Sequence, residues 1–84
     1  MEKEQVEMEL KELIGEVMPE IEDVDFNVDI EQEYGVNSIS IIKLIVAAEN
    51  KFGVEFTDYE LALDNYSTFR NFSDLLSKKI DEVD

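Results

Sequence analysis

The first apolar pattern in the chain has the spacing of an amphipathic helix. Its members are Val6, Leu10, Leu13, Ile14 and Val17, with Glu and Lys residues between them. Pro19 cannot continue a helix, so the pattern predicts a first helix from about Lys3 to Met18 whose apolar stripe packs against another element. Gly15 lies inside it at a cost of about 1 kcal/mol relative to alanine. A close approach of another backbone would explain this glycine, but the sequence alone leaves that question open.

Residues 20–33 change to a period of two. Four apolar residues alternate strictly with acidic and amide residues: Val24, Phe26, Val28 and Ile30. This is the period of a half-buried strand, but a strand needs a pairing partner. The only other alternating piece, Val54-Glu55-Phe56, is very short. We therefore expect an extended loop that inserts alternate side chains into a helical core.

The most apolar stretch predicts a helix from Ser38 to Phe52. Gly35 supplies a turn before it, Asn37 and Ser38 are both residues that favour a helix N-cap, and Gly53 ends it. At 100° per residue, the expected core face carries Ile41, Leu44, Ile45, Ala48 and Phe52. A second face carries Ile39, Ile42 and Val46. So small a domain buries a second stripe with difficulty, so we expect it to contact a partner unless the long acidic loop covers it.

Two shorter helices are predicted after Gly53. Thr57 and Glu60 have the spacing of a capping box, which predicts a third helix over about 58–63. Ser67 or Thr68 can cap a final helix over about 68–80, with Lys78 and Lys79 near its C-terminal end and a frayed tail after Ile80. One face of this helix carries Phe69, Phe72, Leu76 and Ile80. The fold class predicted for residues 1–84 is a single all-α domain, a small four-helix bundle with a long first loop and a short third helix.

The charge limits the partners of this domain. Its 84 residues include 22 acids and 7 bases, for a net charge of −15, and residues 1–37 alone carry −11. Such a chain repels nucleic acid and anionic membrane surfaces and favours a basic partner. We expect a monomer that binds neither nucleic acid nor membrane. Salt should raise its melting temperature by screening the self-repulsion.

The residues that most often carry catalysis or bind metals are missing. The chain has no cysteine and no histidine, which excludes disulfides, Cys/His metal sites and thiol nucleophiles, so we do not expect an enzyme. Acidic or amide residues do occupy the odd positions of an EF-hand loop that would begin at Asp23: Asp23, Asp25, Asn27, Asp29 and Glu31. However, Val28 stands where the turn glycine belongs and Tyr34 where the bidentate glutamate belongs. No specific metal site is predicted, although the acidic loop can bind divalent ions loosely.

No membrane segment or export signal is recognisable in the sequence. The longest apolar run, Ile41 to Ala48, is interrupted by Lys43 and is too short to span a bilayer. No signal peptide opens the chain. We therefore expect a cytoplasmic protein.

Two motifs around the central helix resemble those of the acyl and peptidyl carrier proteins. The first is Gly35-Val36-Asn37-Ser38-Ile39, and the second is Phe52-Gly53-Val54-Glu55-Phe56, which begins fourteen residues after the serine. The order of first helix, long loop, central helix, short third helix and closing helix is also similar to that family over nearly the whole chain.

This resemblance implies a role for Ser38. It would receive 4′-phosphopantetheine from coenzyme A through a separate magnesium-dependent phosphopantetheinyl transferase, with Asn37 and Ile39 beside the attachment point. The thiol of the arm would then carry acyl groups, as thioesters, between acyl-loading and acyl-processing enzymes. A phosphodiester at a helix N-terminus is also favoured by free backbone N–H groups and the helix dipole. Alternatively, Ser38 only caps the helix. Ser40 is disfavoured as the attachment point because it lies about 200° further around the helix.

The chain departs from the family pattern in two ways. The residue before the serine is usually aspartate in the family and here is Asn37. Carriers of fatty-acid synthesis tend to have an acidic central helix, whereas residues 38–52 here are net +1, with Lys43 and Lys51 against Glu49. The second departure favours a specialised carrier, in a polyketide, nonribosomal peptide or dedicated lipid pathway, over that of general fatty-acid synthesis. Partner contacts are expected from five residues: Ile39, Ile42, Lys43, Val46 and Glu49. The alternative function is an unmodified acidic interaction module that docks through the same helix.

Overall fold

Three helices of 15 residues each form the frame of the protein. They are α1 (Lys3–Val17), α3 (Ser38–Phe52) and α4 (Phe69–Val83). The structure is a computed structural model, and it describes residues 2–83. Three short helices complete this part of the chain: α2 (Ile30–Tyr34) and the 3-10 helices η1 (Tyr59–Leu61) and η2 (Leu63–Asn65). Residues 2–83 contain no strand, so the predicted all-α class is confirmed.

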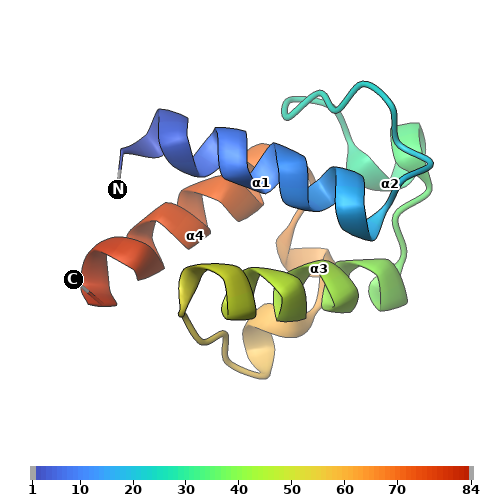
Figure 1. The fold of residues 1–84 in the computed structure, drawn as a ribbon. Helices are drawn as coiled ribbons and strands as arrows, with labels where there is room; N and C mark the ends of the chain where they lie inside the picture. Colours follow the sequence, from blue (N-terminus) through green and yellow to red (C-terminus); the bar gives the residue numbers. More distant parts are fainter. Residues whose placement is uncertain (1, 84) are drawn as a thin grey trace.

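The core lies where the three long helices meet. α1 packs against both α3 and α4, and it runs in the opposite direction to α3 (Figure 1). The predicted core residues of α3 up to Ala48 are fully buried, as are Phe69, Phe72 and Leu76 of α4. Rings from different segments pack together in this core: Phe56 stacks on Phe72 at 5.6 Å, and Tyr34 stacks on Phe69 at 6.0 Å. The helical periodicities therefore predicted the core faces correctly, except that Phe52 at the end of α3 is only half-buried against the core.

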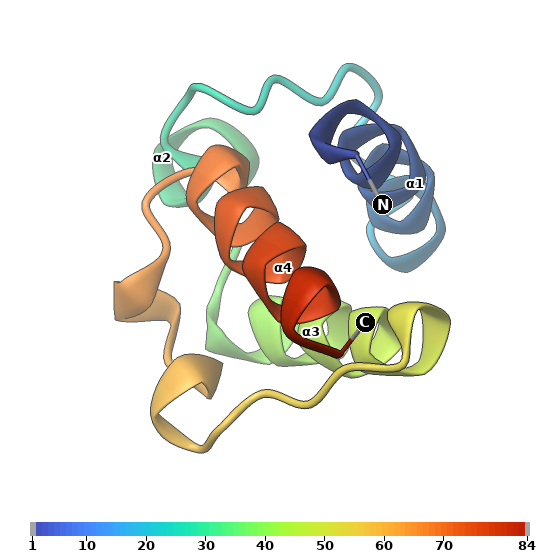
Figure 2. The same cartoon turned by 90° about the vertical axis from the view of Figure 1, so that its left-hand side faces the viewer.

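The long loop, residues 18–29, is anchored to two helices. Phe26 is buried, its carbonyl accepts a 3.0 Å hydrogen bond from the Arg70 N–H at the start of α4, and Val24 and Val28 are half-buried. The Tyr34 hydroxyl donates to the carbonyl of Asp23 and accepts from the N–H of Asp25. The loop passes over the molecule on the side away from α3 (Figure 2). The expectation of a loop with inserted side chains is correct up to residue 29.

The helix α2 was not predicted. Asp29 caps it, because its Oδ1 accepts hydrogen bonds from the N–H groups of Glu31 and Gln32 at 3.0 and 2.9 Å. Ile30 is buried, but it is the first residue of α2. The alternating pattern had included it in the extended loop, which is wrong for this residue. A capping residue at Asp29 followed by Gln32 three positions later was the available signal.

The third and fourth helices differ from the predicted ranges. Residues 58–63 do not form one α-helix, because Ala62 is extended (ψ 130°) between η1 and η2. The capping box itself is present: the Thr57 N–H donates to Glu60 Oε1, and the Glu60 N–H donates to Thr57 Oγ1. The fourth helix starts at Phe69 and continues to Val83, so the expected frayed tail after Ile80 is wrong.

Gly15 has no close neighbour. It is exposed, and a Cβ atom added at this position would have no atom within 4 Å. The suggestion that another backbone approaches it is therefore wrong.

Candidate functional site

The candidate site is the entrance of α3. The helix α2 and the three residues that connect it to α3 fix the position of this entrance. Gly35 ends α2 with a φ of +66°, a left-handed conformation that glycine adopts without the strain of a side chain. The next residue, Val36, is buried, and its N–H donates to the carbonyl of Ile30 at 3.1 Å. The chain is thus fixed in the core only two residues before Ser38. The first turn of α3 lies at the opposite end of the molecule from the start of α1 and the end of α4 (Figure 1).

Asn37 is the N-cap of α3. Its Oδ1 accepts hydrogen bonds from the N–H groups of Ile39 and Ser40, both at 2.9 Å. The Ser40 hydroxyl donates to the same oxygen at 3.2 Å. The rival serine is therefore half-buried and engaged with the cap, a contact that the sequence analysis did not anticipate.

Ser38 is the first residue of α3 and is exposed. Within residues 2–83 its hydroxyl makes no hydrogen bond, so it does not cap the helix. The backbone N–H groups of Asn37 and Ser38 also have no acceptor within this part of the chain. Fewer N–H groups are free than at an uncapped helix end, because Asn37 Oδ1 already accepts from those of Ile39 and Ser40. Two remain beside the Ser38 hydroxyl, at the positive end of the helix dipole.

The second apolar stripe of α3 is exposed to solvent. Its members Ile39, Ile42 and Val46 are 67%, 41% and 47% exposed, and they lie at positions i, i+3 and i+7 on one face. The long loop does not cover them. We call these three residues the α3 stripe. A contiguous apolar surface of this kind is typical of a contact site for another protein.

The two charged residues expected beside the stripe differ in their surroundings. Lys43 is exposed and lies on the stripe side of α3. Glu49 is half-buried, and its Oε2 accepts a 2.9 Å hydrogen bond from the Phe56 N–H. This contact ties the segment after α3 back onto the helix.

A second polar contact fixes η1 to α4. Lys79 Nζ lies 2.8 Å from Glu60 Oε1 and 4.9 Å from the centre of the Phe56 ring. The hydrogen bond from Lys79 is the main reason that the pKa of Glu60 is lowered, and the bond from the Thr57 N–H adds to it. Lys79 therefore supports η1 from α4. The sequence predicted only its position near the C-terminal end of that helix.

Other kinds of site find no support in the described residues. No group of three or more Asp or Glu side chains among residues 2–83 is arranged to hold a metal ion. None of the helices described is both long enough and apolar enough to cross a membrane.

Comparison with known families agrees with this geometry. Residues 9–76 match the family described as "phosphopantetheine attachment site", which is well over half of the chain. The chain therefore belongs to the phosphopantetheine-attachment family of carrier domains. No curated protein and no solved structure is significantly similar to it.

Family membership defines the general role of the protein. It is a carrier that bears 4′-phosphopantetheine covalently and is not itself an enzyme. Such a carrier works with a phosphopantetheinyl transferase and with acyl-handling enzymes.

Proposed function

We propose that Ser38 is the attachment point of the 4′-phosphopantetheine arm. The observation that carries this proposal is the exposed, unbonded hydroxyl of Ser38 at the first position of α3. A transferase can reach this oxygen without disturbing the core. The phosphodiester would lie beside the free N–H groups of Asn37 and Ser38, where the helix dipole favours negative charge. The bound arm supplies a thiol on which acyl groups are carried as thioesters.

Ser40 is the appropriate comparison for this proposal. It lies two residues further along the same helix, but its hydroxyl is half-buried and donates to Asn37. A transferase would have to break that hydrogen bond before reaching it. Ser38→Ala and Ser40→Ala are therefore matched variants that differ in which hydroxyl they remove.

Intact-mass spectrometry after incubation with coenzyme A, magnesium and a broad-specificity transferase tests the assignment. The wild type and Ser40→Ala should each gain one phosphopantetheine, and Ser38→Ala should gain none. If Ser38→Ala gains phosphopantetheine, the attachment point is another residue and the assignment of Ser38 is wrong. If several transferases leave the wild type unchanged, the protein is better described as an unmodified interaction module that docks through α3.

We also propose that acyl-handling enzymes dock on the α3 stripe. Ile39, Ile42 and Val46 supply apolar contacts, with Ile39 also next to the arm, and Lys43 supplies a charge for an acidic group on the enzyme. Glu49 contributes mainly by holding residue 56 against α3, so its contact with an enzyme would be secondary. The protein would act as a monomer.

The charge of α3 favours a specialised carrier. Because Lys43 and Lys51 outweigh Glu49, the docking helix is net +1 in a chain of net charge −15. An enzyme that places an acidic group opposite Lys43, from a polyketide, nonribosomal peptide or dedicated lipid pathway, fits this helix better than one with a uniformly basic docking surface. Lys43→Glu should weaken loading by the cognate enzyme, whereas the same reversal at exposed Lys78 on α4 should have little effect. Equal loading of both variants would contradict the assignment of Lys43.

A further inference from the structure

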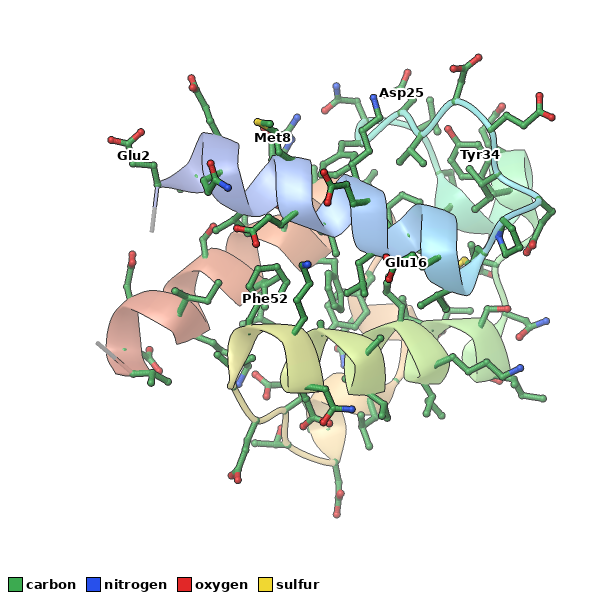
Figure 3. All side chains as sticks on the ribbon, in the orientation of Figure 1. Glu2, Met8, Glu16, Asp25, Tyr34 and Phe52 are labelled. Carbon is green, nitrogen blue, oxygen red and sulfur yellow. The ribbon has the colours of Figure 1, made fainter. Side chains whose placement is uncertain are left out.

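A second surface of the protein lies far from the α3 stripe. A groove of about 730 Å³ runs between the outer side of α1 and residues 23–27 of the long loop. Met8 and Asp25 mark its two sides at the edge of the molecule away from α3 (Figure 3). We call it the α1–loop groove. Nothing in the proposed role of Ser38 requires this groove.

The floor of the α1–loop groove is apolar. Met8 is 61% exposed, so most of its side chain is accessible to a partner. Half-buried Val24 and the buried ring of Phe26 complete this floor. A partner that inserts an apolar side chain here would remove the Met8 side chain from water.

The wall formed by Arg70 is a built part of the groove. Its guanidinium forms an ion pair with Glu7 of α1 and lies 5.4 Å from the centre of the Phe26 ring. Arg70 thereby joins α4, α1 and the long loop. The charge of this arginine is already compensated by Glu7, so it does not make the groove attractive to anions.

The remaining charges make the groove acidic. Glu4, Asp23 and Asp25 line it against a single further base, Lys11, and the lining as a whole is net −2. The surrounding first half of the chain, residues 1–37, is net −11. This field attracts a basic partner and repels a second copy of this chain, nucleic acid or an anionic membrane.

The groove is elongated along α1. Glu4, Met8 and Lys11 all line it and are spaced at i, i+4 and i+7, so it follows two helical turns, or about 10 Å of the helix. An elongated acidic groove with an apolar floor matches the shape and charge of a basic amphipathic segment. We propose that the α1–loop groove binds such a segment of a partner protein, one that carries Lys or Arg residues around an apolar anchor. The partner could then stay bound while an enzyme uses the α3 stripe.

Titration of the unmodified, ¹⁵N-labelled chain with two synthetic helical peptides of equal charge tests this proposal. One peptide carries Lys on one face and Leu on the other, and the second carries Lys and Ser. Amide signals of residues 4–11 and 23–27 should shift with the Lys/Leu peptide while those of residues 39–46 stay in place. The Lys/Ser peptide should bind about tenfold more weakly, because it lacks the apolar anchor.

Two pairs of variants separate a specific groove from general attraction to an acidic protein. Met8→Gln should weaken binding of the Lys/Leu peptide about tenfold. Val83→Gln, at a similarly exposed apolar residue of α4, should leave the affinity for this peptide unchanged. Asp25→Asn keeps the Oδ1 that accepts from Asn27 and should weaken binding about threefold, whereas Asp64→Asn should not.

Three results would overturn the proposal: shifts centred on the α3 stripe, shifts spread evenly over the acidic surface, or equal effects within each pair. Concentration-dependent shifts of the same amides without peptide would point to a second copy instead. Because the chain is unmodified in this assay, its outcome is separate from that of the phosphopantetheine test.

Discussion

Replacing Asn37 tests how the entrance of α3 is held. Asn37→Ala removes the oxygen that accepts from the N–H groups of Ile39 and Ser40, both at 2.9 Å. Loss of an N-cap side chain of this kind costs about 0.5–2 kcal/mol of unfolding free energy, typically about 1. In a domain of this size a loss of about 1 kcal/mol lowers the melting temperature by roughly 4–8 °C.

Two further substitutions at position 37 grade the effect. Asn37→Gly should cost only a few tenths of a kcal/mol, because water reaches the freed N–H groups more easily around glycine. Asn37→Asp keeps both hydrogen bonds and adds attraction to the helix dipole of about 0.3–1 kcal/mol, which the acidic chain partly offsets by repulsion. The expected order of stability is therefore Asp close to Asn, then Gly, then Ala. Ser40→Ala, which removes only the 3.2 Å bond to the cap oxygen, is the control and should change stability less than Asn37→Ala.

Circular dichroism measures this series, by thermal and urea unfolding of the unmodified proteins. If Asn37→Ala has the same melting temperature as the wild type, the cap contributes nothing to stability and Asn37 does not set the position of Ser38. The Ser38 hydroxyl is exposed in the wild type and none of the variants removes it, so all five proteins should accept phosphopantetheine. If Asn37→Ala alone fails to accept phosphopantetheine at a temperature where it is folded, that result would mean that the transferase contacts the Asn37 side chain directly.

Three further predictions concern stability. Gly15→Ala should raise the melting temperature by roughly 4–8 °C, because about 1 kcal/mol of helix propensity is gained at a position with open space, whereas Gly53→Ala, at a φ of +67°, should lower it. A thermal scan in which Gly15→Ala lowers the melting temperature would mean that the added methyl group clashes with a neighbour, contrary to the open space at this position. Burial, and secondarily the charge of Glu60, raises the pKa of Tyr66 from 10.0 to about 12. The neutral phenol is thus favoured in the folded state, and this stabilisation is complete below pH 10 and lost as the pH rises towards 12. The loss, roughly 3 kcal/mol, should appear in urea unfolding of the wild type and be absent in Tyr66→Phe; equal pH profiles would contradict it. Sodium chloride should raise the melting temperature of the wild type most steeply at low ionic strength, and a flat response would mean that the acids are well separated in the fold.

The long helices could be predicted because their own residues decide them. α3 has a glycine turn before it, an N-cap at Asn37 and a glycine after it, and it was predicted with the observed bounds. α1 ends one residue earlier than predicted, at Val17, because Pro19 restricts the residue before it. Exposure of the α3 stripe was expected from the sequence, since a small domain buries two faces of one helix with difficulty. The structure excludes the alternative that the long loop covers the stripe.

The segments that were mispredicted depend on contacts distant in sequence. Ile30 begins α2 and its N–H donates to the carbonyl of Ser67, so the start of this helix is fixed by a residue 37 positions away. Around η1, the Glu60 carbonyl accepts from the Tyr66 hydroxyl and the Glu60 carboxylate pairs with Lys79 of α4. These contacts hold residues 59–65 in two tight turns, where local propensity favoured one α-helix. At η1 tertiary contacts override the local pattern, whereas α2 combines a local cap at Asp29 with the tertiary hydrogen bond from Ile30.

The entrance of α3 suits a tether because the core fixes its position. A mobile arm places its thiol reproducibly only if its attachment point is rigid, and here three successive residues fix the chain: Gly35 turns it, Val36 is buried, and Asn37 caps the helix. Ser38 follows directly and is exposed, so it inherits the rigidity of the core without being enclosed by it. On the proposed docking, the three apolar side chains of the α3 stripe would form only a small contact, of the size found in weak and transient complexes. A carrier that visits several enzymes in turn needs that combination, a fixed attachment point beside a surface that no single enzyme holds for long.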